Sequence, residues 1–317
     1  MTAAPDQAGG ESVVVVTGPT ASGKSSLAIS LAERFTGEVV NADSMQVYRY
    51  MDVGTAKPSL EERARVAHHL FDVVTPDVDY NAARYGVEAR ATVDEIHRAG
   101  RVAFLTGGTG LYIRAFLYGL TGIGGADPEL RERLEGEHAR ASAEGDPERL
   151  HRRLAELDPA AAEKIHANDL RRTIRALEII EASGTSATSA RDQFGFQECP
   201  YRVLHLALDP GVEILNRRID LRCAEMIEGG LLQEVRRLRG MGYGPQLRPM
   251  QAIGYRHVNT VVDGHDTLAN ALVEMQKDTR RFARRQRTWL RKVPDAVWLD
   301  PGAEDAVIRR VEDFLAC

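Results

Sequence analysis

The sequence contains few cysteines and no long apolar run. Its three cysteines, Cys199, Cys223 and Cys317, are widely scattered and form no C-x-x-C pair. This spacing excludes a disulfide framework and a zinc site built on paired cysteines, and it favours a reducing compartment. No apolar stretch approaches the ~20 residues of a membrane-spanning helix, and the opening MTAAPDQAGGES lacks the charged and then apolar pattern of a signal peptide. We therefore expect a cytoplasmic protein that makes no membrane contact, and we interpret residues 1–11 as a disordered tail.

One segment concentrates positive charge in a protein whose formal net charge is −5. Residues 276–292 contain eight basic residues and one acid, Asp278, and we find no acids at helical spacing that would pair with the cations. A basic segment in an otherwise acidic protein indicates a polyanionic partner that binds at a defined place. The alternative is a solvated helix face. Of the two, we favour the polyanionic partner.

The stretch GPTASGKS follows a run of valines and precedes an amphipathic helical pattern. This context and the match to G-x-x-x-x-G-K-[ST] are typical of a P-loop, in which glycines let successive backbone amides converge on phosphate oxygens. A lysine there supplies a point charge and a serine supplies a hydroxyl ligand for Mg²⁺. The pattern leaves open which phosphorylated molecule is bound. The predicted phosphate-binding residues are Gly18, Pro19, Thr20, Ala21, Ser22, Gly23, Lys24 and Ser25.

Short apolar runs alternate with helical patterns along most of the chain, which predicts an α/β fold with a parallel sheet and helices on both faces. The strand candidates are residues 12–17, 38–41, 102–105, 203–208 and 296–299.

The alternation breaks between about residues 121 and 195. There the Asp-Pro pairs in ADPEL, GDPER and LDPAA predict helix starts, because the aspartate can cap and the proline fits the first helical position. A fourth start is expected at Asn168 or Asp169, with an end near Gly184. We predict a P-loop-like catalytic core formed by residues 12–120 and 200–317, and an all-helical insertion domain over residues 121–199.

Two further stretches follow strand candidates, at the edge where open α/β sheets bind their ligands. ADSMQVYRYMDVGTAKP places Asp43 at the mouth of the P-loop, and TGGTGLYIRA offers a second glycine-rich turn with the hydroxyl of Thr109. A kinase or ATPase also needs a strand that ends in an acid for Mg²⁺. Asp209 and Asp300 end strand candidates, but the proline after each is typical of a turn or helix start. A nucleotide as ligand stays open on these residues alone.

The motifs GPTASGKS, NADSMQVYRYMDVGTAKP, LTGGTGLY, QAIGYR and RRFARRQRTWLR, in this order and spacing, closely resemble those of bacterial tRNA dimethylallyltransferases. The resemblance covers residues 13–298. It implies transfer of a dimethylallyl group from dimethylallyl diphosphate to the exocyclic N6 of adenine 37, next to the anticodon of tRNAs that read codons beginning with U. The P-loop would then hold the diphosphate of the donor, and no nucleotide need be hydrolysed.

The resemblance also implies the catalytic set, which is Asp43, Lys24, Thr109 and Arg218. Asp43 would act as the general base that accepts the amine proton. Lys24, Mg²⁺ on Ser25 and a cation from LNRRIDLR would stabilise the charge that develops on the leaving diphosphate. We favour Arg218 for that cation, with Arg217 and Arg222 as alternatives.

The expected partner is the anticodon stem-loop of tRNA, whose unpaired bases proteins read by hydrogen bonding and stacking. The cations of residues 280–292 would hold phosphates and give affinity rather than sequence preference. For Arg131 a charged helix surface is the alternative, and His68 and His69 are expected to pack or to face solvent. The predicted tRNA-binding residues are Asp43, Ser44, Met45, Gln46, Thr109, Arg131, Gln251, Gly254, Tyr255, Arg256, Arg281, Arg284 and Arg285.

Three other functions compete with this prediction. A P-loop kinase would phosphorylate a small metabolite with ATP, but it gives the basic segment no role. An adenylate dimethylallyltransferase would use the same donor on AMP or ATP and would need no anticodon-binding surface. A pure RNA-binding module leaves the P-loop and Asp43 unexplained. We therefore predict a tRNA dimethylallyltransferase that uses Mg²⁺ and acts as a monomer.

Overall fold

The computed structural model describes residues 10–120, 127–194, 199–299 and 304–317. The chain divides into two compact units, the first formed by Met1–Leu117 with Cys199–Cys317 and the second by Tyr118–Glu198. The predicted boundaries at residues 121 and 199 lie close to these, although residues 121–126 and 195–198 are outside the described residues. Most of the predicted disordered tail, residues 1–9, also lies outside them.

The first unit contains a parallel sheet, which in the described residues has six strands in the order β3-β2-β4-β1-β5-β6. All the predicted strands are confirmed, with small shifts of their ends. Only β3 is new, a two-residue strand too short to leave a pattern in the sequence. The strands are β1 (Ser12–Thr17), β2 (Gly37–Asn41), β3 (His68–His69), β4 (Val102–Gly107), β5 (Arg202–Leu208) and β6 (Val297–Leu299).

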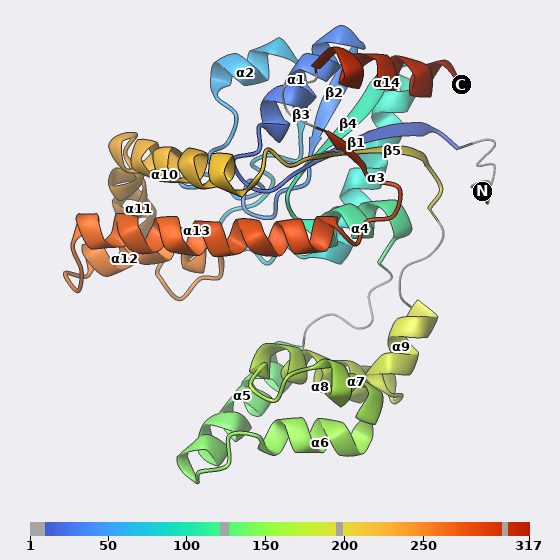
Figure 1. Ribbon diagram of the computed structural model, residues 1–317. Helices are drawn as coiled ribbons and strands as arrows, with labels where there is room; N and C mark the ends of the chain where they lie inside the picture. The colour runs from blue at the N-terminus through green and yellow to red at the C-terminus, as the bar shows by residue number, and fades with distance from the viewer. Residues whose placement is uncertain (1–9, 121–126, 195–198, 300–303) are drawn as a thin grey trace. The chain divides into compact units, whose positions relative to one another are not determined.

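Both faces of the sheet are covered, which explains why β1 reads as an unbroken run of valines with no exposed position after Ser12. Helices α1 (Lys24–Arg34) and α14 (Glu304–Ala316) pack with Val14, Val16 and Phe104 in one hydrophobic core. In Figure 1 helices α3 (Ala82–Arg98) and α4 (Gly110–Tyr118) lie on the other side of the sheet. The predicted α/β architecture is confirmed.

Of the remaining helices of this unit, α2 lies beside α1, and the others lie beyond the carboxyl ends of the strands, where α13 runs alongside α10 (Figure 1). Within the described part of the chain, no helix combines the length and the apolar character needed to cross a membrane. These helices are α2 (Leu60–Arg65), α10 (Val212–Glu228), α11 (Leu231–Gly240), the short 3₁₀ helix η1 (Pro249–Gln251), α12 (Tyr255–Val262) and α13 (Leu268–Leu290).

The second unit is helical throughout its described residues, 127–194, and has its own apolar core that includes Leu134, Leu154 and Leu177. Asp127, Asp158 and Asp169 each cap a helix with the side chain, and Gly184 ends α8 in the left-handed conformation, as predicted. Its helices are α5 (Pro128–Ala143), α6 (Arg149–Leu157), α7 (Pro159–Lys164), α8 (Leu170–Ser183) and α9 (Ala187–Phe194).

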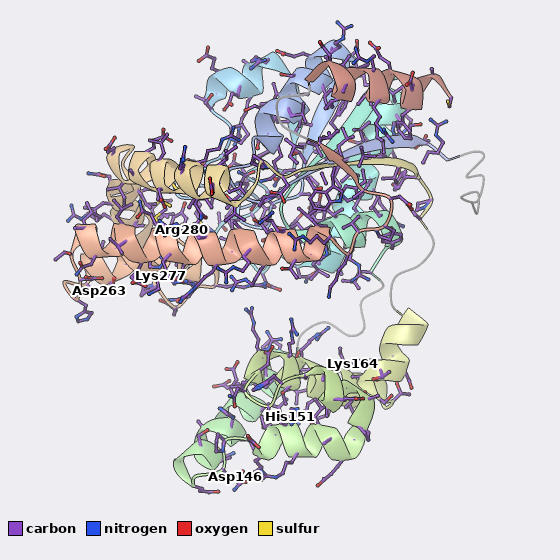
Figure 2. The ribbon with its side chains drawn as sticks, in the orientation of Figure 1. Asp146, His151, Lys164, Asp263, Lys277 and Arg280 are labelled. Atoms are coloured by element: carbon purple, nitrogen blue, oxygen red, sulfur yellow. The ribbon has the colours of Figure 1, made fainter. Side chains whose placement is uncertain are left out.

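One predicted helix start in this unit is wrong. Asp146 does not cap α6, which begins three residues later at Arg149. Its carboxylate instead pairs with Arg149 and Arg152 (Figure 2 labels Asp146), so nearby arginines compete successfully for the capping oxygen.

Candidate functional site

The P-loop forms the predicted connection between β1 and α1. Gly23 takes a left-handed conformation, with φ of 96°, at the start of α1. Gly18 is packed so closely that a side chain there would collide with Ser22 and the carbonyl of Leu208. Backbone amides at the N-terminus of a helix are arranged to receive an anion. The loop therefore has the geometry of a phosphate site.

Lys24 extends from the loop into a cavity and is half-buried. Burial, helped by the positive charge of Arg222, lowers the pKa of the Lys24 ammonium to about 8, while the carboxylate of Asp43 opposes the shift. In the structure its Nζ lies 3.4 Å from the carbonyl oxygen of Pro19. An anion bound at the loop would supply the negative charge that this ammonium otherwise lacks.

Asp43 stands at the end of β2 and is held by its neighbours. The side chain of Asn41 accepts from the Asp43 amide at 2.9 Å and donates to the Asp43 carbonyl at 3.2 Å. One carboxylate oxygen, Oδ1, accepts from the amide of Met45 at 2.8 Å. No hydrogen bond to the other oxygen is seen among the described residues. The carboxylate thus keeps one oxygen available for a proton from a ligand.

Thr109 links the second glycine-rich turn to the loop after Asp43. Its hydroxyl accepts from the amide of Ser44 at 3.0 Å and lies 3.2 Å from the Ser44 hydroxyl. The sequence predicted that these two loops meet at one edge of the sheet, and the structure brings them together.

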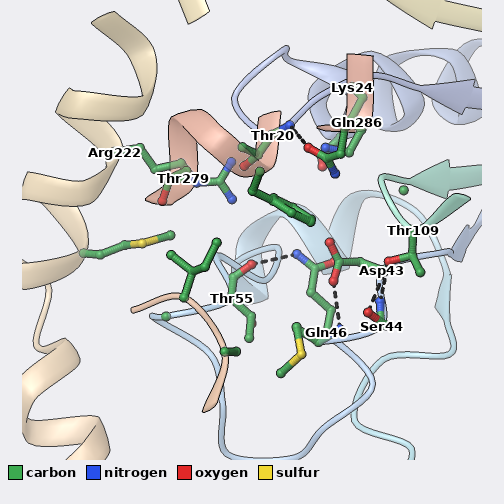
Figure 3. A pocket seen from close by; sticks show the side chains of 18 of the residues that line it. Thr20, Lys24, Asp43, Ser44, Gln46, Thr55, Thr109, Arg222, Thr279 and Gln286 are labelled. Atoms are coloured by element: carbon green, nitrogen blue, oxygen red, sulfur yellow. Dashed lines mark hydrogen bonds between the residues drawn. The ribbon is translucent and has the colours of Figure 1, made fainter. Parts of the chain in front are cut away.

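Gln286 is an important residue that the sequence analysis missed. Its side chain accepts from the amide of Thr20 at 2.8 Å and donates to the carbonyl of Gly108 at 3.0 Å, so α13 joins both glycine-rich loops. Figure 3 shows the bond to Thr20. Gln286 is buried on the face of α13 that also buries Ala283 and Leu290, and no local pattern in the sequence indicates its two distant partners.

The cavity extends from the P-loop toward α10, α12 and α13 and has a volume of about 350 Å³. Its lining combines the predicted phosphate, base and tRNA residues with apolar side chains. Among the lining residues are Lys24, Ser25, Asp43, Ser44, Met45, Gln46, Thr109, Arg222, Gln251, Tyr255, Arg256, Phe282 and Arg285.

The three candidate arginines of α10 occupy different places. Arg222 lines the cavity, where its charge acts on Lys24 and Asp43. Arg218, which we favoured, contacts the P-loop, where it donates to the carbonyl of Ser22 at 3.3 Å, and it is not among the residues that line the cavity. Arg217 is exposed. Arg218 on the P-loop and Arg222 on the cavity wall are both placed near a bound diphosphate, so the choice between them stays a prediction.

The QAIGYR motif is held by internal contacts. Gly254 has a φ of 92°, Gln251 donates to the carbonyl of Pro245, and Arg256 pairs with Asp278 at 2.5 Å. The ring of Tyr255 is fully buried and its hydroxyl donates to Glu234 at 2.6 Å. Tyr255 lines the cavity but has no outer surface of its own for RNA.

The expectation that the basic segment carries no helical-spacing ion pairs is wrong. Asp278 pairs with Arg281 at 3.1 Å, three residues away, as well as with Arg256. Burial opposes ionisation of Asp278, but hydrogen bonds from Arg256, His257 and Arg281 outweigh it and lower the pKa of this carboxyl to about 2.

Other cations of the segment pair with acids distant in sequence or just outside it. Arg280, labelled with Lys277 in Figure 2, pairs with Asp220 at 2.5 Å, and Arg287 pairs with Asp209 at 2.7 Å. Lys277 pairs with Glu274 at 3.1 Å. Within residues 276–292, four exposed cations have no ion pair among the described residues. They are Arg284, Arg285, Arg291 and Lys292.

Arg131 lies in the second unit and makes a two-pronged ion pair with Glu178, at 2.7 and 3.0 Å. Glu178 is almost fully buried and also accepts from Arg175. The guanidinium of Arg131 is still partly exposed. It can therefore contact an RNA while its carboxylate partner fixes its orientation.

The remaining acids and histidines do not add a metal centre. Asp209 is engaged by Arg287, and Asp300 lies outside the described residues. Across the described chain, no three His, Cys, Asp or Glu side chains are grouped to hold a metal ion. His68 packs against Phe71 and His69 pairs with Glu38.

Comparison with known proteins decides the family. The model of the IPP transferase family matches residues 46–293, and that of isopentenyl transferases matches residues 11–71. A tRNA dimethylallyltransferase from Desulfatibacillum aliphaticivorans is 44% identical over 305 residues, which cover 96% of this chain and 98% of the relative. Another from Citrifermentans bemidjiense is 45% identical, over 96% and 97% of the two chains. The chain belongs to the tRNA dimethylallyltransferase family.

Solved structures of the family share this fold. The tRNA isopentenylpyrophosphate transferase of Bacillus halodurans superimposes with a TM-score of 0.69 at 36% identity, over 97% of this chain and 96% of that one. A eukaryotic dimethylallyltransferase acting on tRNA gives a TM-score of 0.81 at 28% identity, over 96% and 80%. The small-metabolite kinase and the AMP- or ATP-modifying alternatives find no support among these relatives.

The residues present fit the Mg²⁺ that the sequence analysis predicted. Ser25 lines the cavity beside Lys24 and makes no hydrogen bond among the described residues. Mg²⁺ usually keeps several waters and is bound through one or two carboxylates and substrate phosphates, and in P-loops a serine or threonine hydroxyl is a ligand. A single serine hydroxyl next to a diphosphate site is sufficient for such an ion, without a cluster of acids.

Proposed function

We propose that the chain transfers a dimethylallyl group from dimethylallyl diphosphate to the exocyclic N6 of adenine 37 in the anticodon loop of tRNAs that read codons beginning with U. The observation that carries this proposal is the presence of Lys24 and Asp43 on one buried cavity. A cation for a diphosphate and a carboxylate for an amine proton are the two groups that this reaction needs. We place the protein in the cytoplasm, where tRNA is modified, and infer that a monomer suffices because one chain supplies both groups.

The donor binds with its diphosphate on the P-loop amides. Lys24 and Arg222 face the leaving group, so the negative charge that builds on the diphosphate as the allylic C–O bond breaks meets fixed positive charge. Ser25 would hold Mg²⁺, which would supply further positive charge next to the diphosphate. The apolar side chains of the cavity, Phe282 and Ile219 among them, surround the dimethylallyl group and limit hydrolysis by water.

Asp43 acts on the acceptor. An exocyclic adenine amine is a weak nucleophile because its lone pair is delocalised into the ring. As the new N–C bond forms, one amine proton passes to the free oxygen of Asp43, and diphosphate leaves. A base inside a tRNA loop reaches this half-buried carboxylate only when it turns out of the loop and enters the cavity.

The RNA is held by charge at the mouth of this cavity. Arg284 and Arg285 are exposed on α13, and Arg285 also lines the cavity. Phosphate contacts of this kind give affinity without sequence preference. Arg131 and the second unit supply further contacts to the stem-loop.

A direct test uses radiolabelled dimethylallyl diphosphate with three acceptors, which are unmodified tRNA, AMP and ATP. We expect label in tRNA alone, located at adenine 37 after nuclease digestion. A tRNA with guanine at that position is the control and stays unlabelled. Label in AMP or ATP but not in tRNA would assign the site to an adenylate dimethylallyltransferase instead.

A further inference from the structure

Residues 51–57, here called the 51–57 loop, are held on one side by a buried carboxylate. Glu234 of α11 is 3% exposed. It accepts from the amides of Asp52, Val53 and Gly54 at 2.9, 2.8 and 3.1 Å, and from the hydroxyl of Tyr255 at 2.6 Å. Hydrogen bonds to an ionised acceptor are among the stronger ones in proteins. Three consecutive amides are thereby fixed to one side chain.

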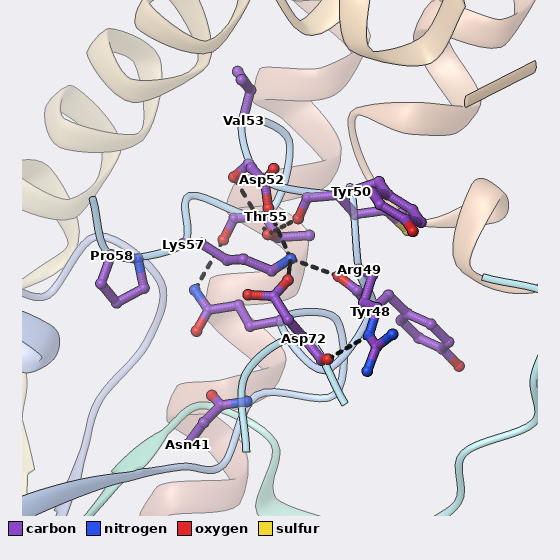
Figure 4. Close-up of polar contacts among 12 residues, drawn as sticks. Asn41, Tyr48, Arg49, Tyr50, Asp52, Val53, Thr55, Lys57, Pro58 and Asp72 are labelled. Carbon is purple, nitrogen blue, oxygen red and sulfur yellow. Dashed lines mark hydrogen bonds and ion pairs between the residues drawn. The ribbon is translucent and has the colours of Figure 1, made fainter. Parts of the chain in front are cut away.

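A buried ammonium holds the other side of the 51–57 loop. The side chain of Lys57 is 2% exposed, and its Nζ donates to the carbonyl of Tyr48 at 2.5 Å. It also pairs with Asp52 at 2.9 Å and Asp72 at 2.6 Å (Figure 4). Loss of Asp52 or Asp72 would leave the buried ammonium of Lys57 with less compensating negative charge. The loop is therefore fixed between an anion and a cation.

The 51–57 loop in turn fixes the orientation of the side-chain amide of Gln46. The carbonyls of Thr55 and Ala56 accept from Gln46 Nε2 at 3.0 and 3.1 Å. An amide nitrogen has two hydrogens to donate, and both are used here. The opposite orientation would set the amide oxygen against two carbonyl oxygens. Gln46 lines the cavity, so the atom that it offers to a ligand is the acceptor Oε1.

We propose that Glu234 and Lys57 are positioning residues, which hold the 51–57 loop so that Gln46 Oε1 and the Asp43 carboxylate form a pair of acceptors for an exocyclic amine. The inference rests on the proposed function. Adenine brings two N–H groups to this pair: one proton passes to Asp43 as the N–C bond forms, and the other stays on the nitrogen, bonded to Gln46. A 6-oxo purine would bring an oxygen to two acceptors and is rejected.

A double-mutant cycle tests whether Glu234 acts through Gln46. Single-turnover transfer is measured with saturating tRNA and donor. Glu234→Gln should lower the rate about 10-fold, the effect of a lost well-oriented hydrogen bond. In the Gln46→Ala background the same change should have little further effect. Lys57→Met should behave like Glu234→Gln.

Glu38→Gln is the matched control, because Glu38 is also a buried carboxylate, paired with His69 and Arg101 and not with the 51–57 loop. Its effect should be the same in both backgrounds. If Glu234→Gln and Gln46→Ala multiply as independent changes do, the positioning role is wrong. If wild-type protein labels no tRNA, the proposed function itself fails, which is a different outcome.

Two further measurements do not depend on a stable Glu234 variant. Gln46→Glu has a donor toward Thr55 and Ala56 only when its carboxyl is protonated, so its rate relative to wild type should rise as pH falls from 8.5 to 6.

The second measurement compares stem-loops with adenine or hypoxanthine at the target position. Wild type should bind the two with different affinity, and Gln46→Ala should reduce that difference several-fold. A flat pH ratio, or an unchanged preference for adenine, would overturn the inference.

Discussion

At the scale of single residues, the proposed reaction depends on two groups of opposite charge in one cavity. Asp43 keeps one carboxylate oxygen free while Asn41 and Met45 fix its backbone and its other oxygen. Lys24 is half-buried and lines the same cavity. Each has a distinct task, so their variants should fail in distinct ways.

Asp43→Ala should slow chemistry and leave binding almost intact. General bases typically contribute ~10²–10⁴-fold to a rate, whereas this carboxylate is one of many groups that face the RNA. Single-turnover rates with saturating tRNA, measured beside tRNA affinity, separate the two effects. A wild-type chemical rate in Asp43→Ala would remove it from the role of base.

Lys24 should make donor affinity depend on pH. Its pKa of about 8 in the free protein rises when a diphosphate adds negative charge, so the donor binds with proton uptake above pH 8. Affinity should be constant below pH 8 and fall as pH increases toward 9.5. Calorimetry in buffers of different ionisation enthalpy measures this uptake. Lys24→Arg remains protonated throughout and should show no decline; an equal decline in that variant would assign the titration to another group.

Helix α13 combines several tasks at the scale of an element. One face buries Ala283, Gln286 and Leu290, and Gln286 holds both glycine-rich loops. The opposite face exposes Arg284 and Arg285. Ion pairs neutralise Arg280 and Arg287, so the number of cations in the segment overstates the charge available to RNA.

The two exposed arginines should account for part of the salt dependence of tRNA binding. Removal of one cation from a phosphate lowers the slope of log affinity against log salt by a little under one unit, about 0.7–0.9. Arg284→Gln with Arg285→Gln should therefore reduce the slope by one to two units and weaken cognate and non-cognate tRNA alike, as filter binding at several salt concentrations would show.

Lys277→Gln with Arg280→Gln is the control on the same helix. Both cations are already paired with protein acids, so the slope should change less. An equal change of the salt slope in the two double variants would show that pairing with acids does not decide which cations bind RNA.

At the scale of the whole molecule, the fold could be predicted well because strand and helix periods, glycine turns and Asp-Pro caps are local signals. The site was predicted less completely. Motifs located Lys24 and Asp43, but no local pattern indicates that Gln286 reaches Thr20 across the sheet edge, or that Glu234 binds the amides of the 51–57 loop. The pairing of Arg287 with Asp209 is equally non-local. Contacts between distant segments depend on packing, which a single sequence does not display.

Stability in mild acid should depend on His205, which lies in the core of the sheet. Burial lowers its pKa to about 4, and its Nε2 lies 2.9 Å from the Thr17 hydroxyl. In the unfolded chain a histidine has a pKa of about 6.5. Between this pKa and that of the folded protein, His205 is protonated in the unfolded chain and neutral in the folded one. The free energy of unfolding should therefore fall as pH drops from 6.5 to 4. At pH 5 this residue lowers it by about 2 kcal/mol.

Denaturant titrations at pH 7 and pH 5 compare wild type with His205→Gln, which keeps a polar group for Thr17 but does not titrate. The variant should lose less stability between the two pH values, whatever its stability at pH 7. An identical loss would mean that other groups, such as His68 and His257, carry the acid sensitivity.

The second glycine-rich turn has a consequence for how sequences of such proteins can vary. A side chain at Gly108 would collide with Gln286, and one at Gly110 with the ring of Trp289. These glycines are thus required by the approach of α13, independently of any ligand. Drift at Gly110 should be tolerated only together with a smaller residue at position 289, so the two positions should change together. The glycines of this turn resemble those of a second phosphate loop, but the close packing of α13 is sufficient to explain them.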